Sequence, residues 1–286
     1  MSIDVFKEIG KSNAIIDAAL EERFKTDEPI VSILLDAERY SVMSGGKRVR
    51  PFLTLEFCRI FGGDTESALP FAMAVEVIHS SSLIHDDLPC MDDDDMRRGK
   101  PSCHIAFGEA NALLAGDALL LYAFELCAEN KATDPSTALE AVSVLAKSTG
   151  NFGMVGGQVI DLYGDTHKLD FDTLLKLHSM KTGALIGAAV KMGCLAAGIK
   201  QGSKEFNDAS LYAKNIGLTF QIIDDILDAR AGEESPEKTT FLTFMSESEA
   251  FEYAKDLTHK AIEVIKKYDG SDVLVAFAEY LLNRDK

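Results

Sequence analysis

The sequence predicts an all-α protein, and three observations lead to this prediction. Apolar residues recur with helical period along nearly every segment of the 286 residues. Proline occurs only seven times, while helix-favouring alanine, leucine, glutamate and lysine are abundant. No alternating pattern of the kind expected for a strand continues for more than a few residues. Because no low-complexity linker or short repeat divides the chain, we expect a single-domain bundle of about ten or more helices over residues 1–286.

The helices are expected, in order, at residues 3–25, 30–43, 50–61, 66–87, 106–130, 135–151, 170–197, 204–229, 247–267 and 272–283. Breaking pairs such as Gly62-Gly63 and Asp134-Pro135 lie between them. Helices 66–87 and 204–229 are apolar for most of their length and end in clusters of carboxylates. A helix that is apolar nearly all round is buried. We therefore expect these two helices to be central, with their acidic ends facing a shared cavity.

Charge and composition exclude several classes of protein. The chain has 46 Asp and Glu against 29 Lys and Arg, a formal charge of −17. This balance argues against general nucleic-acid binding and against docking on anionic lipid. The five cysteines form no CxxC pair, which fits neither a disulfide framework nor a zinc site. We find no signal peptide at the N-terminus and no run of about 18–20 uncharged apolar residues, and expect a cytoplasmic protein without a membrane span.

Two acidic clusters are the first chemical signal. The first contains Asp86, Asp87 and Asp92, within a run that continues to Asp95, and the second contains Asp224, Asp225 and Asp228. Asp224 and Asp228 are four residues apart and share one helix face, while Pro89 ends the other helix and turns Asp92 back towards Asp86. Like charges this close are tolerated when a cation lies between them. Ligands that are all oxygen suit Mg²⁺, which commonly bridges to substrate phosphates.

Basic residues stand beside both acidic clusters. Arg97, Arg98 and Lys100 follow the first cluster, and Lys238 follows the second. Lys47 and Arg50 lie at an expected helix start, where backbone N–H groups and fixed cations can hold a phosphate. Taken singly, each of these residues could be an ordinary surface charge. In combination with the acidic clusters they indicate a site for a phosphate-bearing polyanion.

Several motifs identify a family that the sequence resembles. They are GGKRVRP at 45–51, SLIHDDLPCMDDDDMRRGKPSCH at 82–104, GDALL at 116–120, GMVGGQVIDL at 153–162, KTGALI at 181–186 and FQIIDDILD at 220–228. With these motifs the sequence resembles the short-chain trans-isoprenyl diphosphate synthases, the group of farnesyl and geranylgeranyl diphosphate synthases. The resemblance implies the isoprenoid synthase fold, in which helices surround a deep central cavity, and a homodimer.

The resemblance also implies a role for each matching residue. Mg²⁺, three ions per site, would be bound by Asp86, Asp87, Asp92, Asp224, Asp225 and Asp228. The allylic diphosphate would be held by Arg97, Lys181, Thr182, Gln221 and Lys238. Isopentenyl diphosphate would be held by Lys47, Arg50, His79 and Arg98. Gln158 would line the cavity, and the core of the catalytic set would be Asp86, Asp87, Asp92, Asp224 and Lys181. His104 and His178 are interpreted as structural.

Product length is expected to depend on the floor of the cavity. In the resembling farnesyl synthases an aromatic residue usually stands five positions before the first aspartate, whereas here this position is Ser81. With the small residues Ser81 and Ser82, we expect the chain to grow past C15, to geranylgeranyl diphosphate. Ile78 and Val77, one turn deeper, are expected to form a floor. The enzyme would condense isopentenyl diphosphate with dimethylallyl, geranyl or farnesyl diphosphate.

One departure and several alternatives remain. After Asp228 the family usually has a loop with an additional lysine, whereas residues 229–241 here read ARAGEESPEKTTF. The alternatives are a farnesyl diphosphate synthase and a non-catalytic subunit of a heteromeric synthase, which the short loop would suit. A class I terpene cyclase would have a mixed second motif instead of DDILD, and a di-iron bundle would need Glu-x-x-His pairs, which the sequence lacks.

Overall fold

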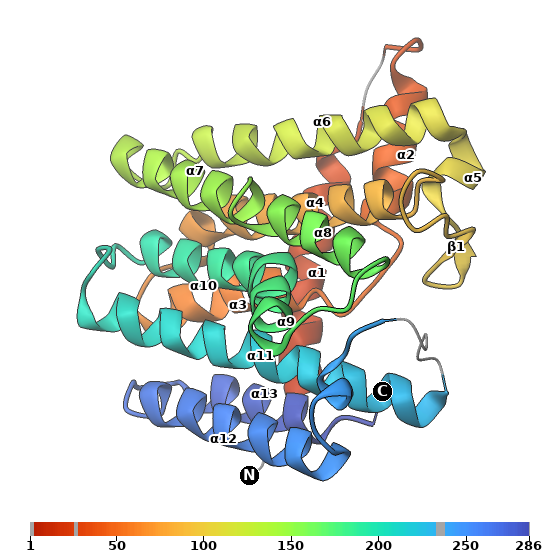
Figure 1. Ribbon diagram of the computed structural model, residues 1–286. Coiled ribbons are helices and arrows are strands. Elements are labelled where there is room, and N and C mark those ends of the chain that lie inside the picture. Colours follow the sequence, from red (N-terminus) through yellow and green to blue (C-terminus); the bar gives the residue numbers. More distant parts are fainter. Residues whose placement is uncertain (1–2, 26–27, 233–237, 286) are drawn as a thin grey trace.

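The computed structural model describes residues 3–25, 28–232 and 238–285, and the all-α prediction is confirmed (Figure 1). The α-helices are α1 (Val5–Arg23), α2 (Ser32–Val42), α3 (Val49–Ile60), α4 (Thr65–Asp86), α5 (Cys103–Phe107), α6 (Glu109–Ala128), α7 (Pro135–Thr149), α8 (Met154–Gly164), α9 (Phe171–His178), α10 (Ala184–Ala196), α11 (Lys204–Ala231), α12 (Glu247–Ile265) and α13 (Asp272–Asn283). A π-helical turn, η1 (Ser179–Gly183), joins α9 to α10, and a 3₁₀ turn, η2 (Phe241–Thr243), precedes α12. A small hairpin pairs β1 (Met96–Arg97) with β2 (Lys100–Pro101).

Local sequence signals begin and end the helices. Asp64 and Ser203 accept hydrogen bonds from the first turns of α4 and α11 through their side chains, as N-cap residues do. Ser246 and Glu249 form a capping box at the start of α12. Gly232, with φ +73°, ends α11 in the left-handed conformation that glycine adopts without steric cost. The boundaries of the two helices with acidic ends therefore follow directly from the sequence.

Helix α4 lies at the centre of the bundle, as expected for an apolar helix. Phe71, Val75 and Ile78 on α4 are fully buried, and the helix packs against α3, α6 and α10. Helix α11 packs against α10 on one side and α12 on the other, and α12 and α13 form the layer farthest from α6 (Figure 1). The ends of α4 and α11 that carry the aspartates point to the same side of the bundle (Figure 1).

Three elements differ from the sequence prediction. Helix α8 was not predicted, because its glycines have low helix propensity. A Cβ at Gly157 would lie 2.3 Å from the backbone nitrogen of Lys181, so this glycine allows α8 to approach η1 closely. The predicted helix 106–130 is divided at Gly108 (φ +83°), which separates α5 from α6. The predicted helix 170–197 is interrupted by η1, and π-helical turns occur frequently at functional sites.

Two helices, Thr65–Asp86 and Glu109–Ala128, are long and apolar enough by length and composition to cross a membrane. This differs from the sequence-based expectation that no stretch is long and apolar enough to span a membrane. Helix α4 is a core helix, and core helices pass the same test. The most apolar stretch of α6 is only 39% buried, and Leu114 and Leu121 are exposed on it. The cytoplasmic location stays a prediction.

A buried carboxyl on α2 should make stability depend on pH. Glu38 is 5% exposed, and burial raises its pKa to about 7. The folded state therefore binds a proton more tightly than the unfolded chain, and stability is lost as pH rises from about 4.5 to 7. We expect Glu38→Gln to raise stability at pH 8 by about 1–2 kcal/mol, allowing for solvent screening, and much less at pH 5.5. Thermal unfolding at both pH values measures this, with the exposed Asp36→Asn on the same helix as the matched control. Equal effects at both pH values would contradict it.

Candidate active site

A cavity of about 570 Å³ lies between α4, α6, α8, η1 and the start of α10. Its upper end is polar, with Asp86, Gln158, Lys181 and Thr182 in the wall. Its lower walls are apolar and come from Leu113 and Leu120 on α6 and from Met154, Val155, Val159 and Leu162 on α8. A second, smaller cavity of about 290 Å³ adjoins it and shares Arg50 and His79 as lining residues. The site therefore combines a cavity that has both polar and apolar walls with a smaller adjoining compartment.

The first acidic motif is folded back on itself. Helix α4 ends at Asp86, and the backbone N–H of Asp92 donates to the Asp86 carbonyl at 2.9 Å, which brings the two residues together as predicted. Burial raises the pKa of Asp86 to about 6, with Lys181 opposing this shift and the nearby Asp92 contributing to it. Burial also raises the pKa of Asp92. Both carboxylates are therefore partly removed from water, and a bound cation would stabilise their ionised forms.

Asp87 has a different environment from Asp86. It is 2% exposed and accepts hydrogen bonds from the guanidinium of Arg97, with the Arg97 Nε at 2.9 Å. Asp94 also contacts Arg97, at 3.0 Å. Both residues were expected to contact ligand, Asp87 a metal and Arg97 a diphosphate. The structure pairs them with each other, so that in this arrangement Asp87 anchors Arg97 beside the cavity.

The second acidic motif faces the first from α11. Asp224 forms an ion pair with Arg284, and Asp225 accepts a hydrogen bond from the backbone N–H of Phe241 at 2.8 Å. Burial raises the pKa of Asp224, an effect that Arg284 opposes and Asp228 adds to. Asp228 is exposed one turn beyond Asp224. Helix geometry thus presents Asp224 and Asp228 on one face, as the spacing predicted.

A hydrogen-bond network connects η1 with this second motif. The Gln221 side-chain oxygen accepts from Thr182 Oγ1 at 3.2 Å and is 2.9 Å from His178 Nδ1. The Gln221 amide nitrogen donates to Asp224 at 3.3 Å. His178 was interpreted as structural, and its ring stacks on Phe241. Thr182 and Gln221 are brought together as one unit of the site.

Lys181 and Lys238 both lie beside Asp161 on α8. Lys181 Nζ forms an ion pair with Asp161, and Lys238 Nζ is 3.7 Å from it. These cations lower the pKa of Asp161 against the opposing effect of its burial. Asp161 was missed at the sequence level, although it stands in GMVGGQVIDL one helical turn after Gln158. Most of the short loop before Lys238, residues 233–237, lies outside the described residues.

Cations dominate the smaller compartment. Arg50 is half-buried, burial lowers its pKa, and its buried Nε has no hydrogen-bond partner in the described chain. Burial lowers the pKa of His79 well below its ordinary value, and Arg50 and Arg98 add to that effect. Arg98 donates to the Gly45 carbonyl, and Lys47 also lines the compartment. Concentrated positive charge that is removed from water fits an anionic ligand.

The sequence analysis did not include Arg284 and Arg48 among the site residues. Arg284 lines the smaller compartment and reaches Asp224, but it lies near the C-terminus in no recognisable motif. Arg48 stands between Lys47 and Arg50, yet its side chain is 2% exposed and pairs with Glu76 at 2.5 Å and Asp17 at 3.1 Å. Arg48 is also among the residues that line the smaller compartment, but its guanidinium is held in these ion pairs, so we expect its role to be mainly structural.

The residues expected to set product length divide into two pairs. Ser81 and Ser82 line the cavity, and Ser81 Oγ donates to the Gly116 carbonyl on α6 at 2.8 Å. Val77 and Ile78, expected as a deeper floor, are fully buried in the core and are not lining residues. The close packing of α4 against α6 and α10 covers them. Side chains of α6 and α8, among them Leu113, Leu120 and Leu162, line the cavity.

No group of three or more His, Cys, Asp or Glu side chains forms a closed metal cage within residues 3–25, 28–232 and 238–285. The acidic residues are divided between two walls, at the ends of α4 and α11. Such a division suits a cation that completes its coordination with water and a ligand phosphate. Burial raises the pKa of Asp86, Asp92 and Asp224, so a bound cation would stabilise the ionised carboxylates in place of the lost water. The donor set therefore fits Mg²⁺.

Comparison with known proteins decides the family. The model of the polyprenyl synthetase family matches residues 31–273. The chain belongs to this family. It is 42% identical to a geranylgeranyl diphosphate synthase of Cyanophora paradoxa, over 95% of this chain and 93% of that protein. It is 40% identical to a farnesyl diphosphate synthase of Escherichia coli, over 88% of this chain and 90% of that protein.

The fold agrees with the same family. The apo crystal structure of an FPP/GFPP synthase from Zymomonas mobilis superposes on this chain with a TM-score of 0.91 at 39% sequence identity. The superposition covers 99% of this chain and 100% of the Zymomonas chain. The chain is therefore a short-chain trans-prenyltransferase with the isoprenoid synthase fold. Synthases of this family use isoprenyl diphosphate substrates and are generally dependent on divalent metal ions.

Proposed function

We propose that this synthase condenses isopentenyl diphosphate with dimethylallyl, geranyl and farnesyl diphosphate to give geranylgeranyl diphosphate. The observation that carries the proposal is the cavity of about 570 Å³, with Asp86, Lys181 and Thr182 at its head and Ser81 in its wall. The apolar walls from α6 and α8 exclude water from an allylic cation. The absence of an aromatic side chain at position 81 leaves room for a chain longer than C15.

The roles of the charged residues follow from their positions. Mg²⁺, three ions per site, would be held by Asp86, Asp87 and Asp92 from one wall and by Asp224, Asp225 and Asp228 from the other. A metal held there would supply positive charge that stabilises the leaving diphosphate. Lys181 and Lys238 exchange their contact with Asp161 for oxygens of that diphosphate, beside Thr182, Gln221, Gln158 and Arg97. Lys47, Arg50, Arg98 and neutral His79 orient isopentenyl diphosphate in the smaller compartment, so that its double bond faces the cation.

The test uses the purified protein alone with Mg²⁺, isopentenyl diphosphate and each of the three primers. We expect turnover with every primer and geranylgeranyl diphosphate as the final product, measured by chromatography of the dephosphorylated alcohols. Accumulation of farnesyl diphosphate would favour the alternative of a farnesyl diphosphate synthase. A protein inactive without a partner would instead be a non-catalytic subunit, and cyclic hydrocarbons would indicate a terpene cyclase.

Enlarging Ser81 should shorten the product. Ser81→Tyr places an aromatic ring in the cavity wall between α4 and α6, where it blocks a growing chain, so we expect mainly farnesyl diphosphate and at least about a tenfold fall in the C20 to C15 ratio. Ser81→Ala is the matched control, because it removes the hydrogen bond to Gly116 and leaves the space open. Unshortened products from Ser81→Tyr, or shortened products from Ser81→Ala, would refute the role of this residue.

We also propose that the enzyme is a homodimer formed through α6 and α7. Leu114 and Leu121 on α6 and Leu139 on α7 are large apolar residues with more than half of their surface exposed. Helix α6 is otherwise apolar enough to pass for a membrane span, and a second copy on this face would bury it. The mass of the purified enzyme by light scattering distinguishes dimer from monomer.

A further inference from the structure

A third large cavity lies behind the catalytic one, on the opposite side of η1. It has a volume of about 630 Å³ and lies between the end of α7, α9, η1, α10, α11 and α12. None of its lining residues lines the catalytic cavity or the adjoining compartment. Its capacity matches that of the catalytic cavity, at about 570 Å³. It is therefore large enough for a ligand of the size of the prenyl products, and nothing in the proposed reaction uses it.

The charge of this cavity is opposite to that of the protein. Lys147, Lys176, Lys191 and Lys214 are among its lining residues, and no aspartate or glutamate is. The chain as a whole has 46 acidic and 29 basic residues, so four cations without an anion around one cavity is a marked local excess. In the described parts of the chain none of the four lysines has an ion-pair partner. The cavity therefore presents an unneutralised cationic wall.

Lys191 is the most unusual of the four. It is the one charged residue of α10, whose sequence is ALIGAAVKMGCLA. Burial lowers its pKa, and no acidic side chain opposes that effect. Placing an ammonium group in a partly buried position without a counter-ion costs free energy, and an anionic ligand would recover it. The position of Lys191 thus indicates where the head group of a ligand lies.

The remaining wall is apolar and has room beside α10. Leu175, Met180 and Leu218 line it. Gly187 stands one turn before Lys191 on the same face, and a Cβ added there would have no atom within 4 Å. The glycine is therefore not required by packing, and it leaves open space along the helix. An apolar wall combined with the ammonium groups of the lining lysines is suited to an anionic amphiphile.

The turn η1 separates the two large cavities and contacts both. Ser179, Met180 and Gly183 line the rear cavity, whereas Lys181 and Thr182 line the catalytic one. His178 also lines the rear cavity, and Gln221 connects it by hydrogen bonds to Thr182 and Asp224. A ligand that holds η1 in the present arrangement would keep Lys181 in its ion pair with Asp161. Occupation of one cavity can thereby reduce turnover in the other.

We propose that the rear cavity is a second, inhibitory site for an isoprenyl diphosphate, with the diphosphate at Lys191 and its neighbouring lysines and the chain along α10 and η1. The identity of the ligand rests on the proposed function, since the product is the anionic amphiphile present where the enzyme acts. Product bound here lowers kcat without competing with the allylic substrate.

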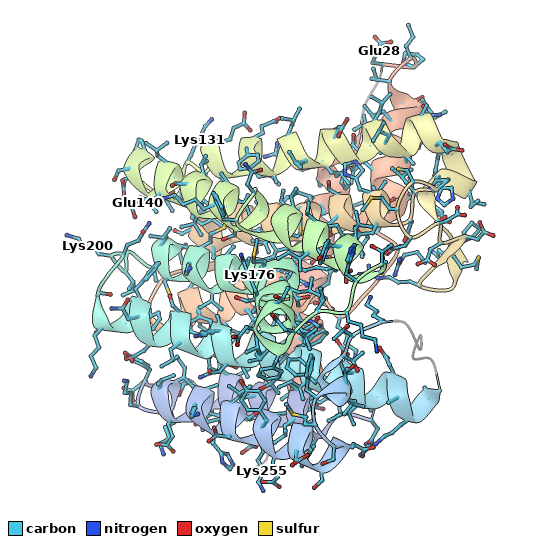
Figure 2. The ribbon with its side chains drawn as sticks, in the orientation of Figure 1. Glu28, Lys131, Glu140, Lys176, Lys200 and Lys255 are labelled. Atoms are coloured by element: carbon cyan, nitrogen blue, oxygen red, sulfur yellow. The ribbon has the colours of Figure 1, made fainter. Side chains whose placement is uncertain are left out.

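The test measures equilibrium binding of geranylgeranyl diphosphate in EDTA, where the metal-dependent catalytic site is weakened. We expect one molecule per chain, with affinity reduced at least about tenfold by Lys191→Gln and by Gly187→Leu, which fills the cavity and keeps every lysine. Lys181→Gln, on the catalytic side of η1, should leave this binding unchanged. Inorganic diphosphate, which lacks the chain, should bind at least about tenfold more weakly. The single variant Lys200→Gln is the charge-matched control for Lys191→Gln, because Lys200 does not line the rear cavity and lies at the left edge of Figure 2, whereas Lys176 lies near its centre.

Two outcomes would overturn the proposal. One is no binding without metal, and the other is binding that Lys181→Gln abolishes while Lys191→Gln and Gly187→Leu leave it intact. In the kinetic assay, both rear-cavity variants should retain basal synthesis and lose the non-competitive component of product inhibition. Failure of the wild type to make any prenyl diphosphate would instead refute the proposed function. The binding measurement without metal would still test the rear site, because it does not depend on turnover.

Discussion

Replacement of Asp86 by asparagine is expected to lower kcat/KM for prenyl transfer about a thousandfold and to leave the protein at least as stable as the wild type. Asp86 lies at the end of α4 and lines the head of the catalytic cavity. The neutral amide is a weaker ligand for a divalent cation and contributes no negative charge to hold it, so the leaving diphosphate loses stabilisation in the transition state. Steady-state kinetics with isopentenyl and farnesyl diphosphate measure the loss.

Stability separates this effect from simple misfolding. Burial raises the pKa of Asp86, with Asp92 and Asp87 adding to the shift, so the ionised carboxylate is unfavourable in the metal-free protein. Its removal should raise the Tm slightly or leave it unchanged. Asp93→Asn is the matched control, because Asp93 is exposed in the same run with φ 54°, a conformation that asparagine tolerates. An active Asp86→Asn enzyme, or an equally inactive Asp93→Asn enzyme, would show that Asp86 is not the residue on which catalysis depends.

The sequence predicted the two central helices well, because burial and chemistry act on the same residues there. Helices α4 and α11 are apolar on most sides and acidic at one end, and in a globular protein that pattern indicates a buried helix whose end opens onto a polar site. The sequence did not predict elements whose structure depends on contacts with other helices. Helix α8 is rich in glycine, and its close approach to η1, at Gly157 against Lys181, is what requires a residue without a side chain there. Asp161 was missed with it.

The partners of the site residues could be predicted less well than their locations. The spacing brought Asp87 and Arg97 to the site but could not show that they pair with each other. Arg284 follows Asp224 by 60 residues, and its contact depends on how α13 ends against α11. Val77 and Ser81 are both buried, but only Ser81 lines the cavity. This difference depends on the tilt of α4 against α6, which helical period alone does not determine.

The two arginines of GGKRVRP provide the second large expected effect, because the structure assigns them opposite roles. Arg50→Met is expected to raise the KM for isopentenyl diphosphate at least about a hundredfold, since it removes a charge-assisted contact with the diphosphate, without lowering stability. Burial lowers the pKa of Arg50, and its Nε has no partner in the described chain, so the folded protein without substrate gains little from this charge. Initial rates at varied isopentenyl diphosphate and thermal unfolding are measured together.

Arg48→Met should do the reverse. The Arg48 side chain is 2% exposed and pairs with Glu76, which is equally buried, at 2.5 Å, so its removal leaves a buried carboxylate without its cation. Breaking such a pair costs about 3–5 kcal/mol, and we expect a large fall in the Tm with a much smaller change in the KM of the protein that remains folded. The double change Arg48→Met/Glu76→Leu should recover most of the lost stability, because it removes the stranded charge. Equal loss of stability in both single variants would mean that Arg50 is also structural, and the compartment shared by Arg50 and His79 would then need another anion-binding group.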